Sequence, residues 1–339
     1  MNPLPLVTIV IPVFNQRADF LRQCIDSALA QSYPNLEILV SDNHSNNGTS
    51  EVILGYVDPR LRVVNPPHHL TMIQNFTFAA SQAHGELLSF LPSDDWLEKD
   101  WLNVMQGVLA RHPAAAFVYC DLTWHAVDSG ESSRYRCDAF PSRYFTDSEA
   151  IHHFGKLICR NTSAYVVGAL IRSAAYFKSS GWQDAGISYA GDACLGLDLL
   201  KHGGVAYENQ ALANYRVWTA KQGKAADTRV SVFSCRDMAK IYDWAESDAA
   251  FRAIAHRAGF SFFKARLRIT AFFLLAYIKT LIDDPSDIPL HEDFQDALKT
   301  LSRGWLPKWV TSIFRTRLIL QSIRFFRGKV EKRIRASFL

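Results

Sequence analysis

Two adjacent carboxylates at the end of an apolar run are the residues best suited to chemistry in this chain. Asp94 and Asp95 follow Ser93, directly after the apolar segment 86–92, which reads as a buried strand. Carboxylate oxygens suit hard ions such as Mg²⁺ and Mn²⁺, which proteins commonly share with substrate phosphates. In an open α/β sheet, ligands bind at the carboxyl ends of the strands. The alternative is that both acids only cap a helix that starts near Trp96, so the motif alone leaves both interpretations open.

The elements that must position this pair alternate between strand-like and helix-like segments. Residues 7–13 form a continuous β-branched run of the kind found in buried parallel strands. We expect further strands at 36–41, 61–64, 86–91 and 115–120, and helices at 20–29, 50–56, 71–83 and 99–110. Such alternation predicts a parallel sheet with right-handed crossovers.

Beyond residue 120 this alternation weakens. Residues 121–146 predict loops over the active face, and 221–224 predict a further loop. We expect helices at 147–154, 174–179 and 192–202, and strands at 164–171, 206–207 and 214–218. From residue 230 the pattern is helical, with a break at 283–287. The chain therefore divides into a domain at 1–225 and a helical C-terminal region at 226–339.

Composition indicates a folded protein with an uneven charge. The chain has 339 residues, of which 48% are hydrophobic, so it can bury a sizeable core. Its formal net charge is +4, but residues 303–335 contain ten Lys or Arg and the single acid Glu331. This tail points to an anionic partner surface, either membrane or nucleic acid.

The cysteines and the apolar segments indicate the cellular compartment of the protein. Six widely spaced cysteines without a Cys-x-x-Cys pair fit a reduced, cytoplasmic setting. Residues 7–13 follow no basic segment, so we interpret them as a strand and not a signal peptide. The longest uncharged apolar stretch, 269–278, is about half the ~20 residues that a spanning helix needs. We therefore expect no transmembrane segment.

The basic tail also has helical periodicity. Leu306, Trp309, Val310, Ile313 and Phe314 share one helical face, and basic residues follow them. A basic amphipathic helix within 305–335 would lie in an anionic membrane interface. The alternative is a helix packed on the body of the protein with a solvated basic face. Nucleic acid is not expected, because no aromatic and basic motif for reading bases accompanies the charge.

The order of these segments resembles the family-two glycosyltransferases of the GT-A fold. The resemblance is carried by 7–15, 24–38, 41–49, Asn75 with 83–86, and 90–96; it returns at 168–182 and 191–216 and ends near 225. It implies an α/β protein whose GT-A-type nucleotide-binding sheet is mixed, mostly parallel and flanked by helices, with a helical C-terminal extension. It also implies an inverting hexosyl- or N-acetylhexosaminyl-transferase.

The resemblance further implies a nucleotide pocket. Pro12, Phe14 and Asn15 match the segment that packs against the donor's base. Asp42 matches the acidic residue that hydrogen-bonds the base, and Asn75 matches a position that lines the pocket. A nucleotide-sugar donor, with a UDP-sugar favoured, is therefore expected.

The catalytic parts are implied in the same way. Asp95 aligns with the ligand of a Mn²⁺ or Mg²⁺ ion, and Asp94 with the residue facing the ribose or donor sugar. Asp192 stands at the position of the general base, which takes the proton of the acceptor hydroxyl. Because Asp192 is also at a predicted helix start, its alternative role is an N-cap.

Three residues depart from the family's pattern. Ser41 stands where an Asp is frequent, and Gly191 replaces an acid before Asp192. Trp218 stands where a His is frequent, so Arg216, Lys221 and Lys224 are the candidate phosphate contacts.

The function expected from these parts is transfer of a sugar to a glycan or lipid-linked acceptor in cell-surface polysaccharide or glycolipid assembly. The protein would be cytoplasmic and peripheral at the inner membrane face. The departures motivate an alternative, a non-catalytic sugar-nucleotide-binding scaffold. A nucleotidyltransferase would need a Gly-rich phosphate loop after the first strand, and residues 14–17 are not one.

Overall fold

The computed structural model describes residues 3–135, 141–158, 166–182, 187, 191–217, 223–283 and 288–304, with the backbone alone at 153–158, 223–231, 279–283 and 288–291. The described residues form two compact units. The first takes in 3–135, 141–150, 166–182 and 191–217 and contains the sheet. The second takes in 151–158, 187, 223–283 and 288–304 and is helical.

The first unit is built on a mixed sheet. Its strands are β1 (Val7–Val13), β2 (Leu36–Asp42), β3 (Leu61–Val64), β4 (Leu87–Phe90), β5 (Trp96–Leu97), β6 (Ala115–Ala126), β7 (Ser132–Tyr135), β8 (Arg143–Phe145), β9 (Leu170–Arg172) and β10 (Gly204–Val217). The order is β3-β2-β1-β4-β9-β6-β10-β5, with β7 paired to β6 and β8 to β10. Strands β1 to β4 are parallel to one another, and β9 runs antiparallel to both β4 and β6. The mixed, mostly parallel sheet is thus confirmed.

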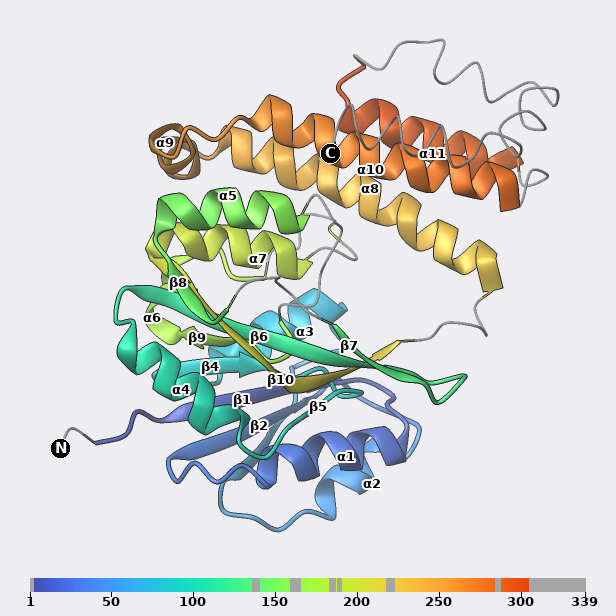
Figure 1. Cartoon of the computed structure of the whole chain (residues 1–339). Helices are drawn as coiled ribbons and strands as arrows, with labels where there is room; N and C mark the ends of the chain where they lie inside the picture. Colours follow the sequence, from blue (N-terminus) through green and yellow to red (C-terminus); the bar gives the residue numbers. More distant parts are fainter. Residues whose placement is uncertain are drawn as a thin grey trace. The chain divides into compact units, whose positions relative to one another are not determined.

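The parallel half contains a change of direction. From β1 the chain adds β2 and β3 on one side, and it then crosses back to place β4 on the other side of β1. Helices α1 (Ala18–Leu29) and α2 (Thr49–Leu54) lie on one face of these strands and α3 (Met72–Ser81) on the other, as right-handed crossovers require (Figure 1). Such a switch point, between β1 and β4, is where open α/β sheets bind ligands.

Three local predictions are corrected by the structure. Trp96 does not start a helix: it belongs to β5, and α4 (Trp101–Arg111) begins five residues later. Residues 121–146 are not loops alone, since β6 continues to Ala126 and β7 and β8 follow. The two short strands expected at 206–207 and 214–218 are one long strand, β10, whose register shifts at two bulges between Glu208 and Ala213.

The other helices of this unit agree broadly with their predicted places. Helix α5 (Asp147–Ile158) begins in it, and α6 (Ser173–Lys178), α7 (Gly191–Leu199) and the 3₁₀ turn at Leu200–His202 complete it. The side chain of Thr71 caps α3 by accepting from the Gln74 backbone N–H, and the Gln74 side chain accepts from the Thr71 N–H in return. This capping box fixes the start of the helix that faces the switch point.

Gly168 provides a test of the packing behind the site. Its φ is +79°, and a Cβ there would lie 2.7 Å from the Ala213 Cβ and 2.9 Å from the Cys120 Sγ. We expect Gly168→Ala to cost the left-handed strain of about 1 kcal/mol and a further ~2 kcal/mol for overpacking. Gly130, with φ +72° and no neighbour within 4 Å, is the matched control. Equal losses of stability in Gly168→Ala and Gly130→Ala, measured by urea unfolding, would contradict this packing.

The second unit is a helical bundle. It contains α8 (Gly223–Ser247), α9 (Ala249–Arg257), α10 (Phe262–Asp283) and α11 (Ile288–Leu301), of which α8, α10 and α11 pack on one another. Buried Arg266 donates to Asp243 Oδ1 at 2.8 Å and to the Leu301 carbonyl at 3.1 Å. Among the described residues, no helix combines the length and the apolar character that crossing a bilayer requires.

Candidate active site

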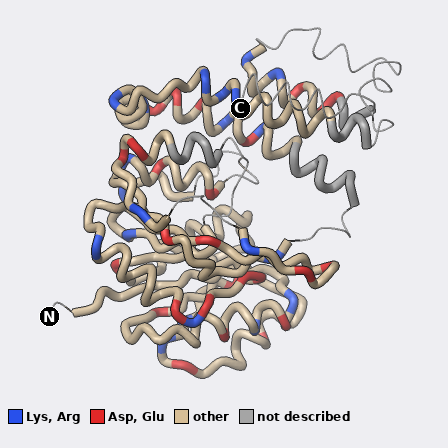
Figure 2. The backbone as a smooth tube through the Cα atoms, in the orientation of Figure 1, with Lys and Arg blue, Asp and Glu red and all other residues tan. Residues whose placement is uncertain are grey.

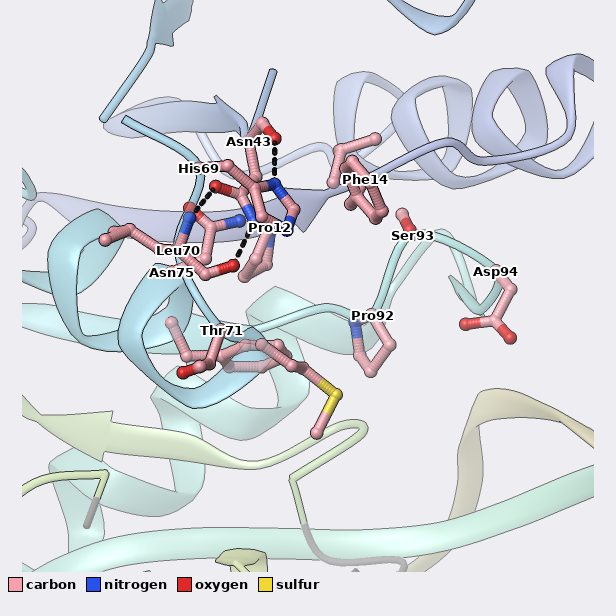
Figure 3. A pocket seen from close by; sticks show the side chains of 13 residues that line it. Pro12, Phe14, Asn43, His69, Leu70, Thr71, Asn75, Pro92, Ser93 and Asp94 are labelled. Atoms are coloured by element: carbon pink, nitrogen blue, oxygen red, sulfur yellow. Dashed lines mark hydrogen bonds between the residues drawn. The ribbon is translucent and has the colours of Figure 1, made fainter. Parts of the chain in front are cut away.

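A pocket of about 390 Å³ lies at the carboxyl ends of β1 to β4. Each of these parallel strands is followed by a segment that lines it. The lining residues are Pro12, Val13 and Phe14 after or at the end of β1, Asn43 after β2, His69, Leu70 and Thr71 after β3, Pro92, Ser93 and Asp94 after β4, and Met72, Asn75 and Phe76 on α3. Figure 3 shows these side chains around one hollow. The volume is within the range of small-molecule sites.

One wall of the pocket is an aromatic pair, of which Phe14 was predicted from the sequence and His69 was not. Phe14 is 48% exposed, and its ring centroid lies 4.5 Å from that of His69 (Figure 3). The His69 Nδ1 lies 3.1 Å from the Asn43 carbonyl. The Asn43 side chain donates to the Leu70 carbonyl and accepts from the Leu70 N–H, both at 2.8 Å. Asn43 therefore holds the 69–71 loop against the pocket, in a contact between residues too far apart in sequence to be predicted.

The predicted pocket residue Asn75 is buried at the base of α3 and lines the pocket. Its side chain accepts from Ser41 Oγ at 2.7 Å and donates to the Ser41 carbonyl at 3.3 Å. Ser41, one of the three departures from the family's pattern, thus holds the Asn75 side chain in place and is itself fully buried. A carboxylate at 41 would need room beside this amide.

The two acids of the motif differ in their surroundings, because one lines the pocket and the other contacts the backbone of β10. Asp94 is half-buried and lines the pocket, at the position seen beside Ser93 in Figure 3. Asp95 is 0% exposed, and its Oδ1 accepts from the Arg216 backbone N–H at 2.9 Å. The sequence assigned the ion to Asp95 and the ribose or donor sugar to Asp94, and both assignments stay predictions. In the structure, Asp94 is the acid that lines the pocket. The Asp95 N–H bonds the Pro92 carbonyl at 3.0 Å, and this tight turn sends the adjacent side chains in different directions.

The electrostatics of this pair favour a cation. Burial raises the pKa of Asp94, and burial together with the Asp94 charge raises the pKa of Asp95 well above its usual range. Asp95 Oδ2 is buried and has no hydrogen-bond partner in the described part of the chain. A pair of carboxylates with too few hydrogen-bond donors around it can be stabilised by a hard divalent ion. No three His, Cys, Asp or Glu side chains of the described residues converge on one point, so the remaining ligands would come from substrate phosphates and water.

Arg216 lies beside the acids but is already engaged. Its guanidinium lies 4.0 Å from the Phe20 ring centroid and 4.4 Å from that of Trp96, and it donates to the Gln23 side chain. It is 8% exposed and is not among the pocket-lining residues. The prediction of a phosphate contact at Arg216 therefore has no support from its position. Lys221 and the side chain of Lys224, like the tail 305–335, lie outside the described residues.

Two further predicted residues support the pocket from behind. Asp42 is buried; its Oδ1 accepts from the Ser45 N–H at 3.1 Å and its Oδ2 from Ser50 Oγ at 2.5 Å. Asn15, with φ +48°, donates from its N–H to Ser45 Oγ at 2.9 Å. Neither lines the pocket. They order the loop after β2, as an Asx turn does.

Asp192 lies in the first turn of α7, in the same unit as the acids. Burial raises the pKa of its carboxyl well above the usual range. The Tyr215 hydroxyl is within electrostatic range of Asp95, Asp192 and Asp94, and its pKa is raised by burial and by these charges. All three carboxylates thus act on the pKa of one residue of β10, although Asp192 is not among the residues that line the pocket.

Packing accounts for the glycine before Asp192. A Cβ at Gly191 would lie 3.3 Å from the Ile73 Cδ1 and 3.4 Å from Trp182. Thr77 of α3 also donates from its hydroxyl to the Trp182 carbonyl at 3.3 Å. The start of α7 is thus packed against the helix that lines the pocket, which leaves little space for an acid at 191.

Comparison with known proteins finds similarity to one family. Residues 8–164 match the model of Glycosyl transferase family 2. Hyaluronan synthase of Pasteurella multocida is 31% identical over 157 residues, which are 45% of this chain and 16% of that protein. A protein of Bacillus subtilis, described as putative teichuronic acid biosynthesis glycosyltransferase TuaG, is 27% identical over 64% of this chain and 81% of its own length. The chain thus spans less than a fifth of some relatives.

Two solved structures share the fold. TarS of S. aureus, residues 1–349, matches with a TM-score of 0.62 and 13% identity, covering 98% of this chain and 91% of that one. The mannosyltransferase PcManGT of Pyrobaculum calidifontis, in complex with GDP-Man and Mn²⁺, matches with a TM-score of 0.55 and 16% identity, covering 96% and 88%. TarS has also been solved in complex with UDP-GlcNAc, and that structure has a TM-score of 0.52 to this chain. These matches confirm the expected GT-A fold.

Proposed function

Since this chain belongs, through residues 8–164, to glycosyl transferase family 2, we propose that it moves a sugar from a nucleotide-diphosphate sugar to an acceptor hydroxyl with inversion of configuration. The observation that carries the proposal is the placement of Asp94 at the rim of a pocket between β1 and β4, the switch point of the sheet. An aromatic wall and an acid that line one pocket suit a molecule with a flat base and a diphosphate.

The base of the donor would lie at the Phe14 end of this pocket. Base–aromatic stacking contributes about 1–3 kcal/mol per base, and Phe14 is exposed enough to offer its ring face. The polar Asn43 and His69 line the same end. A UDP-sugar is the favoured donor, supported by the TarS complex with UDP-GlcNAc, while the complex of PcManGT contains GDP-Man.

The chemical step needs a base and a stabilised leaving group. Asp192 would accept the proton of the acceptor hydroxyl, and burial, which raises its pKa, makes it a better proton acceptor near neutral pH. Asp94, which lines the pocket, would hold Mn²⁺ or Mg²⁺, and such an ion would neutralise charge on a departing diphosphate. Asp95 fixes the backbone of Arg216 and so positions the end of β10.

The acceptor and the place of action belong to the same proposal. The relatives named for hyaluronan and teichuronic acid assembly support a glycan or lipid-linked acceptor in cell-surface polysaccharide synthesis. The enzyme would act in the cytoplasm, peripheral at the inner membrane face. This location suits an acceptor that is extended at the membrane.

A donor screen tests the proposal. The full chain is heated with each of a panel of nucleotide sugars in Mn²⁺, because a ligand that binds only the folded state raises the Tm. The sugar that raises Tm is then incubated with the protein, and nucleotide release is measured. Release that needs Mn²⁺ supports a transferase. A Tm increase without release would favour the scaffold, and no Tm increase with any sugar would contradict both.

Phe14→Ala is expected to weaken nucleotide binding by about tenfold or more, because it removes a stacking face worth about 1–3 kcal/mol. The fold should not change, since the side chain is half exposed. Calorimetric titration with UDP measures the Kd. Leu54→Ala, at an apolar side chain that is 75% exposed on α2, is the control. Equal affinities of the two variants would place the base elsewhere.

A further inference from the structure

The helical unit contains a long basic segment without acids. Between Asp248 and Asp283 the sequence has six Lys or Arg and no Asp or Glu. Figure 2 shows Lys and Arg on α9 and at the start of α10. Buried Arg266 is paired with Asp243, so it does not contribute to the surface. We call the residues 249–268 the basic corner.

The basic corner is a fixed structure and not a frayed loop. The Asp248 side chain caps α9 by accepting from the Phe251 N–H at 2.7 Å. The ring centroids of Phe251 and Phe262 lie 6.2 Å apart, and those of Phe260 and Phe262 5.4 Å apart, so α9 is packed on the start of α10. The turn between the two helices contains Gly259, with φ +63°.

The outer surface of the corner combines cations with an aromatic side chain. Arg252, Lys264 and Arg268 are exposed, and the last two share a face of α10 because they are four residues apart. Phe263, between them and the turn, is 66% exposed. An exposed Phe among cations is typical of surfaces that lie in the headgroup region of a membrane.

We infer that the basic corner is a docking surface for an anionic lipid bilayer, with Phe263 entering the interface and the cations contacting lipid phosphates. Each Lys or Arg near an anionic bilayer contributes about fivefold to binding. The exposed Phe favours a bilayer over a soluble polyanion, which would be bound by charge alone. This surface is made by residues that precede 305–335 in the sequence, and it does not depend on the proposed transferase activity.

Flotation of the full chain with phosphatidylcholine vesicles, with and without phosphatidylglycerol, tests the inference. We expect flotation only with phosphatidylglycerol, decreasing at high NaCl as charges are screened. The double variant Arg252→Glu/Lys264→Glu should bind at least about thirtyfold more weakly. Lys99→Glu/Arg111→Glu, at exposed cations of the first unit, is the matched control and should float like the parent.

A single substitution distinguishes a bilayer from a soluble polyanion. Phe263→Ala should weaken vesicle binding about tenfold, because it removes the apolar contact, while Leu54→Ala should not. Binding of heparin should be the same for Phe263→Ala and the parent. All variants change exposed side chains, and equal Tm values would verify their folding.

Two outcomes would overturn the inference. If Arg252→Glu/Lys264→Glu floats as well as the parent, the binding comes from another segment such as 305–335, which every variant retains. If Phe263→Ala floats like the parent while the charge reversal does not, the corner binds polyanions without entering a bilayer. Nucleotide release measured without lipid should be unchanged throughout, which separates this inference from the proposed function.

Discussion

Asp94→Asn is expected to lower kcat for sugar transfer on the order of 10³-fold, whereas Asp95→Asn should stay within about tenfold of the parent. The difference follows from their positions, because Asp94 lines the pocket and Asp95 is fully buried behind it. An amide at 95 can still accept from the Arg216 N–H through its Oδ1, so the local structure is retained. Initial rates at saturating donor and Mn²⁺ measure both variants.

The stability of the two variants provides the control. Burial raises the pKa of Asp95 well above its usual range, so the charged form destabilises the folded state at neutral pH. A neutral amide at position 95 should therefore leave Tm unchanged or higher. A loss of activity in Asp95→Asn with an intact Tm, equal to the loss in Asp94→Asn, would contradict the assignment.

Asp192→Asn is expected to reduce transfer by about 10²- to 10⁴-fold without weakening donor binding, because it removes the general base alone. Asp100→Asn, at an exposed acid before α4 that makes no capping bond, is the matched control and should be fully active. The readouts are kcat from nucleotide release with acceptor present, and Kd for UDP by calorimetry. Retained kcat with normal donor affinity would leave Asp192 as an N-cap only.

The pH dependence gives this assignment a signature of its own. A base works only when deprotonated, so the rate should increase as pH rises through the pKa of Asp192 in the folded enzyme. Because burial raises this pKa, the acid limb of the kcat profile should lie above the usual range of an aspartate, near 4. The limb should disappear in the residual activity of Asp192→Asn. A limb at the ordinary aspartate pKa would contradict Asp192 as the base.

Much of the fold could be predicted because its signals are local. The apolar runs at 7–13 and 36–41 and the helical spacing at 20–29 identify β1, β2 and α1 without knowledge of their neighbours. The antiparallel insertion of β9 between β4 and β6 could not be predicted this way. It is a short strand of three residues, and its place depends on pairing with segments far away in the sequence.

The position of the site could be predicted from the sequence, but the directions of its side chains could not. The apolar run before Ser93 shows where β4 ends, and hence that the acids lie at a strand end. Which acid faces the ligand depends on the turn closed by the Asp95 N–H and the Pro92 carbonyl, and on the Arg216 N–H, which is 121 residues away. His69 carried no signal of its own, since adjacent histidines in a loop are mostly solvated, and its role follows from its contacts with Phe14 and Asn43.

The central claim is that Asp94 provides the pocket's carboxylate for a divalent ion that is shared with the donor's diphosphate. Calorimetric titration of UDP into the parent, Asp94→Asn and Asp95→Asn, each in Mn²⁺ and in EDTA, tests it directly. The account predicts that Mn²⁺ tightens UDP binding by about tenfold or more in the parent and Asp95→Asn and has no effect in Asp94→Asn. Full Mn²⁺ enhancement in Asp94→Asn, with its loss in Asp95→Asn, would contradict it.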